Sequence, residues 1–178
     1  MPRIPYLDDE AAGPADLVAA IRERRGGELL NLDRILLHSP PLARGWGALL
    51  GAVRGEFELT ALTRELTICT VASLTGADYE LHHHEALFLQ AGGSQAQFDA
   101  LVADAASAAQ ETELFDAGQR ALMAFAVAST RHVTIDEATF AALREHWPRP
   151  RQQVEIVALI AAYNMAARVL VASGITPE

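Results

Sequence analysis

Two side chains that could perform acid/base chemistry lie close together in an otherwise apolar segment, RELTICTVASLTGADYELHHHE, at residues 64–85. Glu80 and His84 are four residues apart, so on a helix they share one face. A carboxylate beside an imidazole orients the ring and tunes its pKa, which suits a general acid or base. The alternative is an ordinary pair on a helix surface, which contributes roughly a few tenths of a kcal/mol.

Glu65 lies fifteen residues before Glu80, in a segment that reads as a helix over residues 61–74. Its helical face includes Ile68 and Cys69, so the carboxylate is drawn toward the interior. Burying a carboxylate alone is costly, and Glu65 therefore needs a partner or a proton. We predict that Glu65, Glu80 and His84 form a catalytic set. The alternative is that Glu65 sits in the first turn of its helix and pairs with an arginine.

Neighbouring residues extend this candidate site. Tyr79 can donate a hydrogen bond into the same cavity, or it is a half-buried amphipathic ring. We place Tyr79 and His83 among the substrate-binding residues. Consecutive side chains on a helix point roughly 100° apart, so His82, His83 and His84 cannot all bind one metal ion. A zinc site at Glu80, His83 and His84 would need a further ligand from another element, and we predict no metal.

A second polar group interrupts the apolar run near the C-terminal end of the sequence, IVALIAAYNMAARVLVA. Asn164 and Arg168 are four residues apart and share a helical face. An arginine in such a helix normally pairs with a carboxylate. Arg168 is therefore either part of a structural ion pair or subunit contact, or it is an anchor for an acidic substrate.

The elements that must position these residues are nearly all helices, and strand patterns are weak. Proline, capping-box and glycine signals mark their ends. The predicted helices cover residues 16–25, 29–38, 40–53, 61–74, 78–91, 95–103, 113–129, 135–146 and 151–172. Thr134 with Glu137 is the expected capping box of the eighth. We divide the chain into an N-terminal arm with a short helix, residues 1–27, and a helical domain, residues 28–178.

The charge and the distribution of apolar residues indicate which classes of protein this sequence can belong to. The net charge of −9 argues against binding to nucleic acid. The first residues lack the apolar core of a signal peptide, and no apolar run reaches the roughly 18–20 residues that span a bilayer, so we expect a cytoplasmic protein. The helices near residues 61–75 and 152–172 are apolar on almost every face, which indicates central burial or packing between subunits. A homo-oligomer is expected.

A single cysteine, Cys69, excludes a disulfide within the chain and a CxxC redox pair. A lone cysteine in an apolar helix is usually a small core residue.

The central segment resembles the signature of the carboxymuconolactone decarboxylase and alkyl hydroperoxidase D-like superfamily. Redox members of that superfamily carry a glutamate, then CxxC, then a histidine four residues past the second cysteine. In this chain Glu65 and His84 match the glutamate and the histidine, while Ala77 and Glu80 stand at the two cysteine positions. The ending YNMAAR is also similar to the family's last helix.

The resemblance implies an all-α, alkyl hydroperoxidase D-like fold that assembles into trimers or hexamers. Because both thiols are missing, thiol peroxidase activity is disfavoured. The chain looks more like the decarboxylase branch, which acts on a lactone carboxylate and needs no cofactor. In that reading Glu80 and His84 supply acid/base groups, and Arg168 or Arg64 binds the substrate carboxylate.

The sequence therefore predicts a cofactor-free acid/base enzyme acting on a small carboxylated, lactone-type molecule. Two alternatives remain. One is a non-catalytic oligomeric binding or scaffold protein in which the polar cluster is structural. The other is residual peroxidase chemistry through Cys69.

Overall fold

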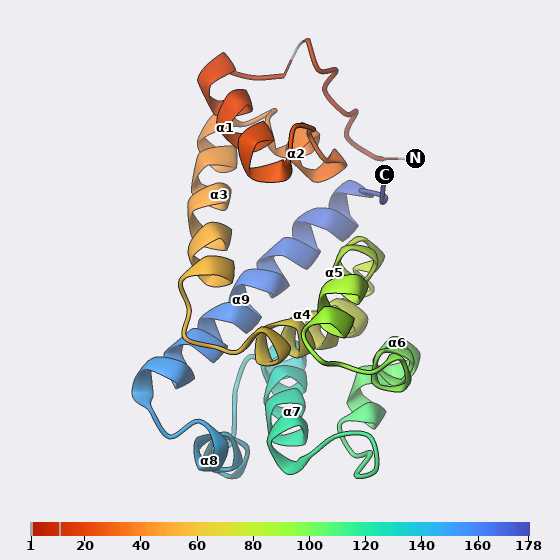
Figure 1. Cartoon of the computed structure of the whole chain (residues 1–178), viewed down its shortest axis with the longest axis vertical. Coiled ribbons are helices and arrows are strands. Elements are labelled where there is room, and N and C mark those ends of the chain that lie inside the picture. Colours follow the sequence, from red (N-terminus) through yellow and green to blue (C-terminus); the bar gives the residue numbers. More distant parts are fainter. Residues whose placement is uncertain (1, 11) are drawn as a thin grey trace.

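The computed structural model describes residues 2–10 and 12–178, and it is all-helical as the sequence predicts (Figure 1). Over these residues there is no strand. The helices are α1 (Ala15–Arg25), α2 (Asn31–Leu36), α3 (Pro40–Gly55), α4 (Ala61–Thr75), α5 (Asp78–Gln90), α6 (Gln95–Ala108), α7 (Ala117–His132), α8 (Glu137–His146) and α9 (Pro150–Ser173).

Several helix ends form through the side chains that the sequence indicates. The Thr60 hydroxyl accepts a hydrogen bond from the Thr63 N–H at 3.1 Å and so caps α4. Gly76 ends that helix in the left-handed conformation, with φ at 65°. Ser94 and Gln97 form the capping box of α6. These caps fix where α4 ends and hence where α5, which carries Glu80 and His84, begins.

Other helix ends differ from the prediction because the structure uses aspartate caps. α7 begins at Ala117 rather than near residue 113, since the Asp116 carboxylate accepts from the Gln119 N–H at 2.8 Å. α8 is capped by Asp136, not by Thr134. α6 continues to Ala108 through a break at Asp104, whose backbone is extended with φ at −166°.

α4 is the central helix and packs against α5, α6, α7 and α9. Ile68, Cys69 and Val71 have no exposed surface. Two threonine hydroxyls in the same helix are also fully buried, and they donate to carbonyls four residues earlier: Thr67 to Thr63 at 2.8 Å and Thr70 to Leu66 at 2.7 Å. A helix buried on nearly every side can hold polar groups only where each finds a partner.

α9 crosses the molecule diagonally and packs against α3, α4 and α7 (Figure 1). By length and composition α9 is apolar enough to cross a membrane, so the expectation that no segment meets this criterion is wrong. Half of its most apolar 18-residue window is buried inside the structure. The core helix of a soluble protein has the same composition.

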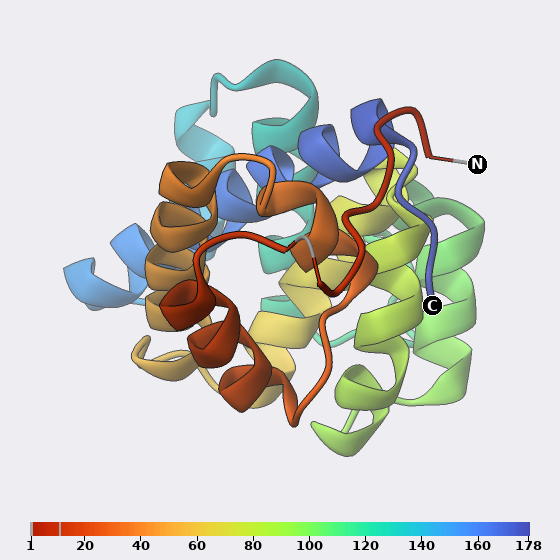
Figure 2. The ribbon, with the colours of Figure 1, turned by 90° about the horizontal axis from the view of Figure 1, so that it is seen from above.

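The N-terminal segment forms a layer over one end of α3, α5 and α9 (Figures 1 and 2). Leu17 and Ile21 of α1 belong to the same hydrophobic core as the later helices. The Arg3 N–H donates to the Ser173 carbonyl at 2.8 Å, which brings the start of the chain beside the end of α9. This layer supplies one wall of the candidate site.

Candidate active site

The structure brings Glu65, Glu80 and His84 together across the α4–α5 contact. His84 Nδ1 lies 2.6 Å from Glu65 Oε2, and His84 Nε2 lies 3.2 Å from Glu80 Oε2. All three side chains are buried, with 3%, 7% and 3% of the surface of Glu65, Glu80 and His84 exposed. One imidazole is thus held at both ring nitrogens by carboxylates from two helices.

Glu65 is the firmly anchored carboxylate of the pair. Its Oε1 accepts from Arg64 Nε at 2.9 Å, so each oxygen has a basic partner. Burial raises the pKa of Glu65, but hydrogen bonds and charge from His84 and Arg64 outweigh it and lower that pKa below its usual range. Glu65 is therefore a stable anion that fixes the orientation of the His84 ring.

The protonation of His84 follows from the same contacts. Burial lowers the pKa of His84, yet the hydrogen bonds and negative charges of Glu65 and Glu80 outweigh burial and raise that pKa above its usual range. The protonated ring can donate from Nδ1 to Glu65 and from Nε2 to Glu80. When the ring is neutral with its proton on Nδ1, the Nε2 lone pair is free to accept a proton.

Tyr163 of α9 completes the group around Nε2. Its hydroxyl lies 3.5 Å from His84 Nε2, and the two rings meet edge to face with centroids 5.5 Å apart. Burial raises the pKa of Tyr163, which keeps the phenol neutral. In the sequence Tyr163 is one of the residues that interrupt the apolar run IVALIAAYNMAARVLVA, and the pattern indicates no role for it. Its spacing of four residues from buried Leu159 and Ala167 is the signal that it faces inward.

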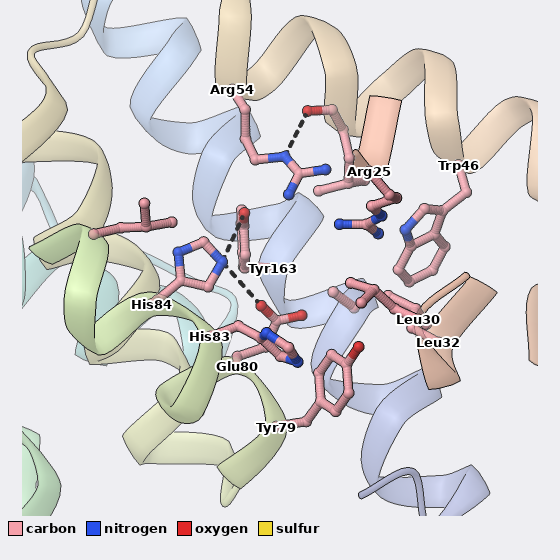
Figure 3. A pocket seen from close by; sticks show the side chains of 13 residues that line it. Arg25, Leu30, Leu32, Trp46, Arg54, Tyr79, Glu80, His83, His84 and Tyr163 are labelled. Carbon is pink, nitrogen blue, oxygen red and sulfur yellow. Dashed lines mark hydrogen bonds and ion pairs between the residues drawn. The ribbon is translucent and has the colours of Figure 1, made fainter. Parts of the chain in front are cut away.

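A cavity of about 200 Å³, here called the site cavity, opens in front of His84 Nε2 (Figure 3). Glu80, His84 and Tyr163 form its polar side. Apolar side chains from the N-terminal layer and α3 form other walls: Leu30, Leu32, Trp46 and Leu50. The volume and mixed lining suit a small molecule that has both an apolar body and a polar group.

Two arginines face this cavity from α1 and α3, and the sequence did not single out either (Figure 3). Arg25 is already engaged, because it binds both oxygens of Asp33 at 3.0 and 3.2 Å. Arg54 Nε donates to the Leu50 carbonyl at 3.3 Å, and among the described residues no carboxylate lies within 4.0 Å of its guanidinium. Arg54 is the cation of the cavity whose charge is available to a ligand.

Tyr79 and His83 also line the site cavity, as part of its rim. The Tyr79 hydroxyl donates to Glu178 Oε1 at 3.3 Å, and His83 Nε2 lies 2.9 Å from Glu178 Oε2. Burial raises the pKa of Tyr79, so its hydroxyl stays protonated. Both residues are therefore near the catalytic candidates, but they face a carboxylate of the chain itself.

Arg168 does not join the site. Its guanidinium donates to the carbonyl and to the side-chain oxygen of Asn164, at 2.8 and 3.1 Å, and it faces solvent on another side of α9. It lines a separate groove with Val133 and Met165. Arg168, one of the predicted substrate-binding residues, thus lies away from the site cavity.

The histidine run divides between three environments. His82 is exposed, His83 is at the cavity rim, and His84 is in the buried network. Over residues 2–10 and 12–178, no three metal-binding side chains are arranged to hold a metal ion. Cys69 is fully buried, and burial together with the charges of Glu65 and Glu80 raises its pKa, so a thiolate is disfavoured.

Comparisons with known proteins agree with this architecture. The model of the carboxymuconolactone decarboxylase family matches residues 40–128, and this chain belongs to that family. The matched range contains Arg54, Glu65, Glu80 and His84. A search of curated proteins found no match.

Solved structures resemble the chain over nearly its whole length. One, from Ralstonia eutropha JMP134, is described as an alkylhydroperoxidase AhpD core and an uncharacterized peroxidase-related protein. It has a TM-score of 0.84 at 24% sequence identity, and the match covers 99% of this chain and 92% of the Ralstonia chain. A peroxidase-related protein from Silicibacter sp. TM1040 has a TM-score of 0.80 at 26% identity, over 99% and 94%. The debrominase Bmp8, in complex with 2,3,4-tribromopyrrole, has a TM-score of 0.74 at 23% identity, over 97% and 90%.

Proposed function

We propose that this protein is an acid/base enzyme, similar to carboxymuconolactone decarboxylase, that acts on a small carboxylated lactone-type substrate in the site cavity. The observation that carries the proposal is His84, whose Nδ1 is held by Glu65, while its Nε2, paired with Glu80, faces the cavity. An oriented imidazole with a raised pKa is a proton donor placed where a substrate would lie. The lack of a CxxC pair disfavours thiol peroxidase chemistry.

In this proposal Arg54 holds the substrate's carboxylate. Its guanidinium is the cavity cation without a carboxylate partner among the described residues, and such a group binds a carboxylate through two parallel hydrogen bonds. Leu30, Leu32 and Trp46 contact the apolar part of the substrate. The substrate's reacting carbon then lies against His84 Nε2 and Glu80.

The reaction conserves atoms and charge without an oxidant or reductant. The carbon–carboxylate bond breaks, CO₂ leaves, and the electron pair stays on the carbon next to the lactone. His84 Nε2–H gives its proton to that carbon, and the neutral ring regains a proton from solvent. Glu65 holds the ring in place and stabilises its charged form, while the neutral Tyr163 hydroxyl can donate to developing negative charge.

The test is turnover. Purified protein is incubated with carboxymuconolactone and simpler carboxylated lactones while CO₂ release is measured. We expect His84→Ala to abolish release while the oligomeric state stays intact. Arg54→Gln should raise the KM at least tenfold, and Arg44→Gln, an exposed arginine on the same helix, serves as its matched control. Unchanged turnover in His84→Ala would contradict the proposal.

The scaffold alternative predicts a different pattern in the same variants. If the polar network only stabilises the fold, His84→Ala lowers the melting temperature and no lactone is consumed by any form of the protein. The buried network is compatible with that role, but a cavity lined by an unpaired arginine is not needed for it.

We also propose that the chain self-associates, through the outward face of α9. Val154, Val157 and Val171 are exposed on this helix, at 67%, 43% and 45%. Beside them lies a groove of about 470 Å³, lined mostly by apolar atoms. Sedimentation velocity should show an oligomer that Val157→Glu dissociates and that Val102→Glu, an exposed valine on α6, leaves intact. A monomeric parent protein would contradict this.

A further inference from the structure

One carboxylate of the chain, that of Glu178, contacts two residues that line the site cavity, Tyr79 and His83. Glu178 accepts from the backbone N–H of Asn31 at 2.6 Å and from the Tyr79 hydroxyl at 3.3 Å. His83 Nε2 lies 2.9 Å from its other oxygen. Three polar groups from two separate parts of the chain thus converge on one carboxylate beside the cavity.

The side chains that contact Glu178 are packed in place, and all three groups can donate a hydrogen bond to an anion. Tyr79 is only 4% exposed, and its ring packs against the His83 ring with centroids 4.3 Å apart. Both side chains also line the site cavity, next to Leu30 and Leu32. A hydroxyl, a backbone N–H and an imidazole N–H are all donors, and together they select a carboxylate.

Glu178 does not satisfy all three of these hydrogen-bond donors. Although it is close to Glu178, His83 Nε2 is a buried atom without a well-formed hydrogen bond, and no other buried side-chain nitrogen or oxygen of the described residues is in that state. An unsatisfied buried donor costs free energy. A carboxylate with better alignment to His83 would therefore bind more favourably than Glu178 does.

Apart from the contacts of Glu178 itself, the segment that carries this residue is held by hydrogen bonds on the surface. Ile175 is 8% exposed and belongs to the core. Beyond Ile175, Thr176 forms hydrogen bonds with Tyr6 and Asn31, and all of these bonds are exposed to solvent. Exposed hydrogen bonds contribute little net stability, and segments held in this way open readily. Residues 176–178 can therefore leave while Ile175 stays in place.

We propose that Tyr79, His83 and the Asn31 N–H form a carboxylate-binding subsite at the rim of the site cavity, which Glu178 occupies as an internal ligand. A free small carboxylate competes with Glu178 for this subsite. The proposal concerns binding alone, so it is independent of whether the protein turns over a lactone, although the same acidic substrate class fits both. It assigns Tyr79 and His83 a role that differs from contact with the reacting carbon.

The experiment uses benzoate as the probe and its neutral analogue benzamide as a control. Binding to the full-length protein is measured by calorimetry and by the ring signals of His83 in NMR. We expect Glu178→Ala to bind benzoate at least tenfold more tightly than the parent protein, because the internal ligand is gone. Glu113→Ala, an exposed glutamate far from the cavity, should change nothing, and benzamide should bind none of the proteins.

Double variants separate this subsite from Arg54. The gain from Glu178→Ala should disappear when Tyr79→Phe is added and persist when Arg54→Gln is added. If Glu178→Ala brings no gain, or if only Arg54→Gln removes the gain, the subsite does not exist as proposed. A gain in binding without lactone turnover would leave this inference standing and count against the proposed enzyme activity.

Discussion

Replacing Glu65 by glutamine tests whether charge holds the buried network together. The glutamate has two oxygens, and each accepts from a different donor: His84 Nδ1 at 2.6 Å and Arg64 Nε at 2.9 Å. Glutamine offers one oxygen and one NH₂ group, so while His84 is protonated on both ring nitrogens one donor must face another donor. An unsatisfied buried donor costs about 1–3 kcal/mol, and a lost charged hydrogen bond costs about 1.5–3 kcal/mol.

Because these two costs overlap, we expect Glu65→Gln to lower the free energy of unfolding by roughly 2–4 kcal/mol, or the melting temperature by roughly 5–15 °C in a chain of this length. Urea titration followed by circular dichroism measures the change, at one fixed protein concentration because association shifts apparent stability. Glu80→Gln is the matched control. Glu80 lines the cavity and contacts His84 at 3.2 Å, so its loss should be smaller, about 1–2 kcal/mol.

The pH dependence sharpens this prediction. The pKa of Glu65 is lowered below 4.5, so the stability that it contributes is present above that pH and is lost as pH falls through its pKa in the folded protein. The pKa of His84 is raised above 6.5, so its contribution is present below that pH and is lost as pH rises through its folded pKa. The difference between parent and Glu65→Gln should be largest between pH 4.5 and 6.5. Equal urea midpoints at pH 5.5 would refute the reasoning.

Three further predictions concern other parts of the molecule. Cys69 should resist alkylation by iodoacetamide in the native protein and react only after unfolding, since it is fully buried with a raised pKa. Gly93→Ala should lower the free energy of unfolding by about 1–3 kcal/mol in urea titrations, because a Cβ there would lie 2.2 Å from the buried ring of Phe88. Gly92→Ala is the control: its Cβ would meet no atom, and the substitution should cost about 1 kcal/mol because the backbone φ is positive. Glu178→Gln should lower the pKa of His83 in an NMR titration, because burial already lowers it while Glu178 raises it.

The sequence is sufficient to predict the fold and the contact between Glu65, Glu80 and His84, for physical reasons that particular residues illustrate. Capping side chains such as Thr60 and Ser94 define helix ends locally, and the spacing of Glu80 and His84 places them on one face. Because Glu65 lies on the inward face of its helix, the sequence indicated that its carboxylate needs a partner. In the structure Arg64 and His84 are its partners.

The rest of the cavity depends on tertiary packing that no local pattern encodes. Arg54 reaches the cavity only because α3 packs against α9, and nothing in its neighbourhood distinguishes it from other arginines. The sequence left Arg168 open between a structural contact and a substrate anchor, because α9 is apolar on almost every side and its periodicity did not show which face is outward. Tyr163 and Arg168 are five residues apart on that helix, and they face opposite environments.

Part of the wall of the site cavity precedes the range that the family model matches, which has a consequence for the shape of ligand that the cavity can hold. Glu65, Glu80 and His84 lie on two adjoining helices inside the range that the family shares, residues 40–128. The wall residues Leu30 and Leu32 belong to the preceding N-terminal layer, outside that range, whereas Trp46 and Leu50 lie inside it. Substitutions in this layer can reshape the volume offered to a ligand while the proton-handling groups keep their geometry.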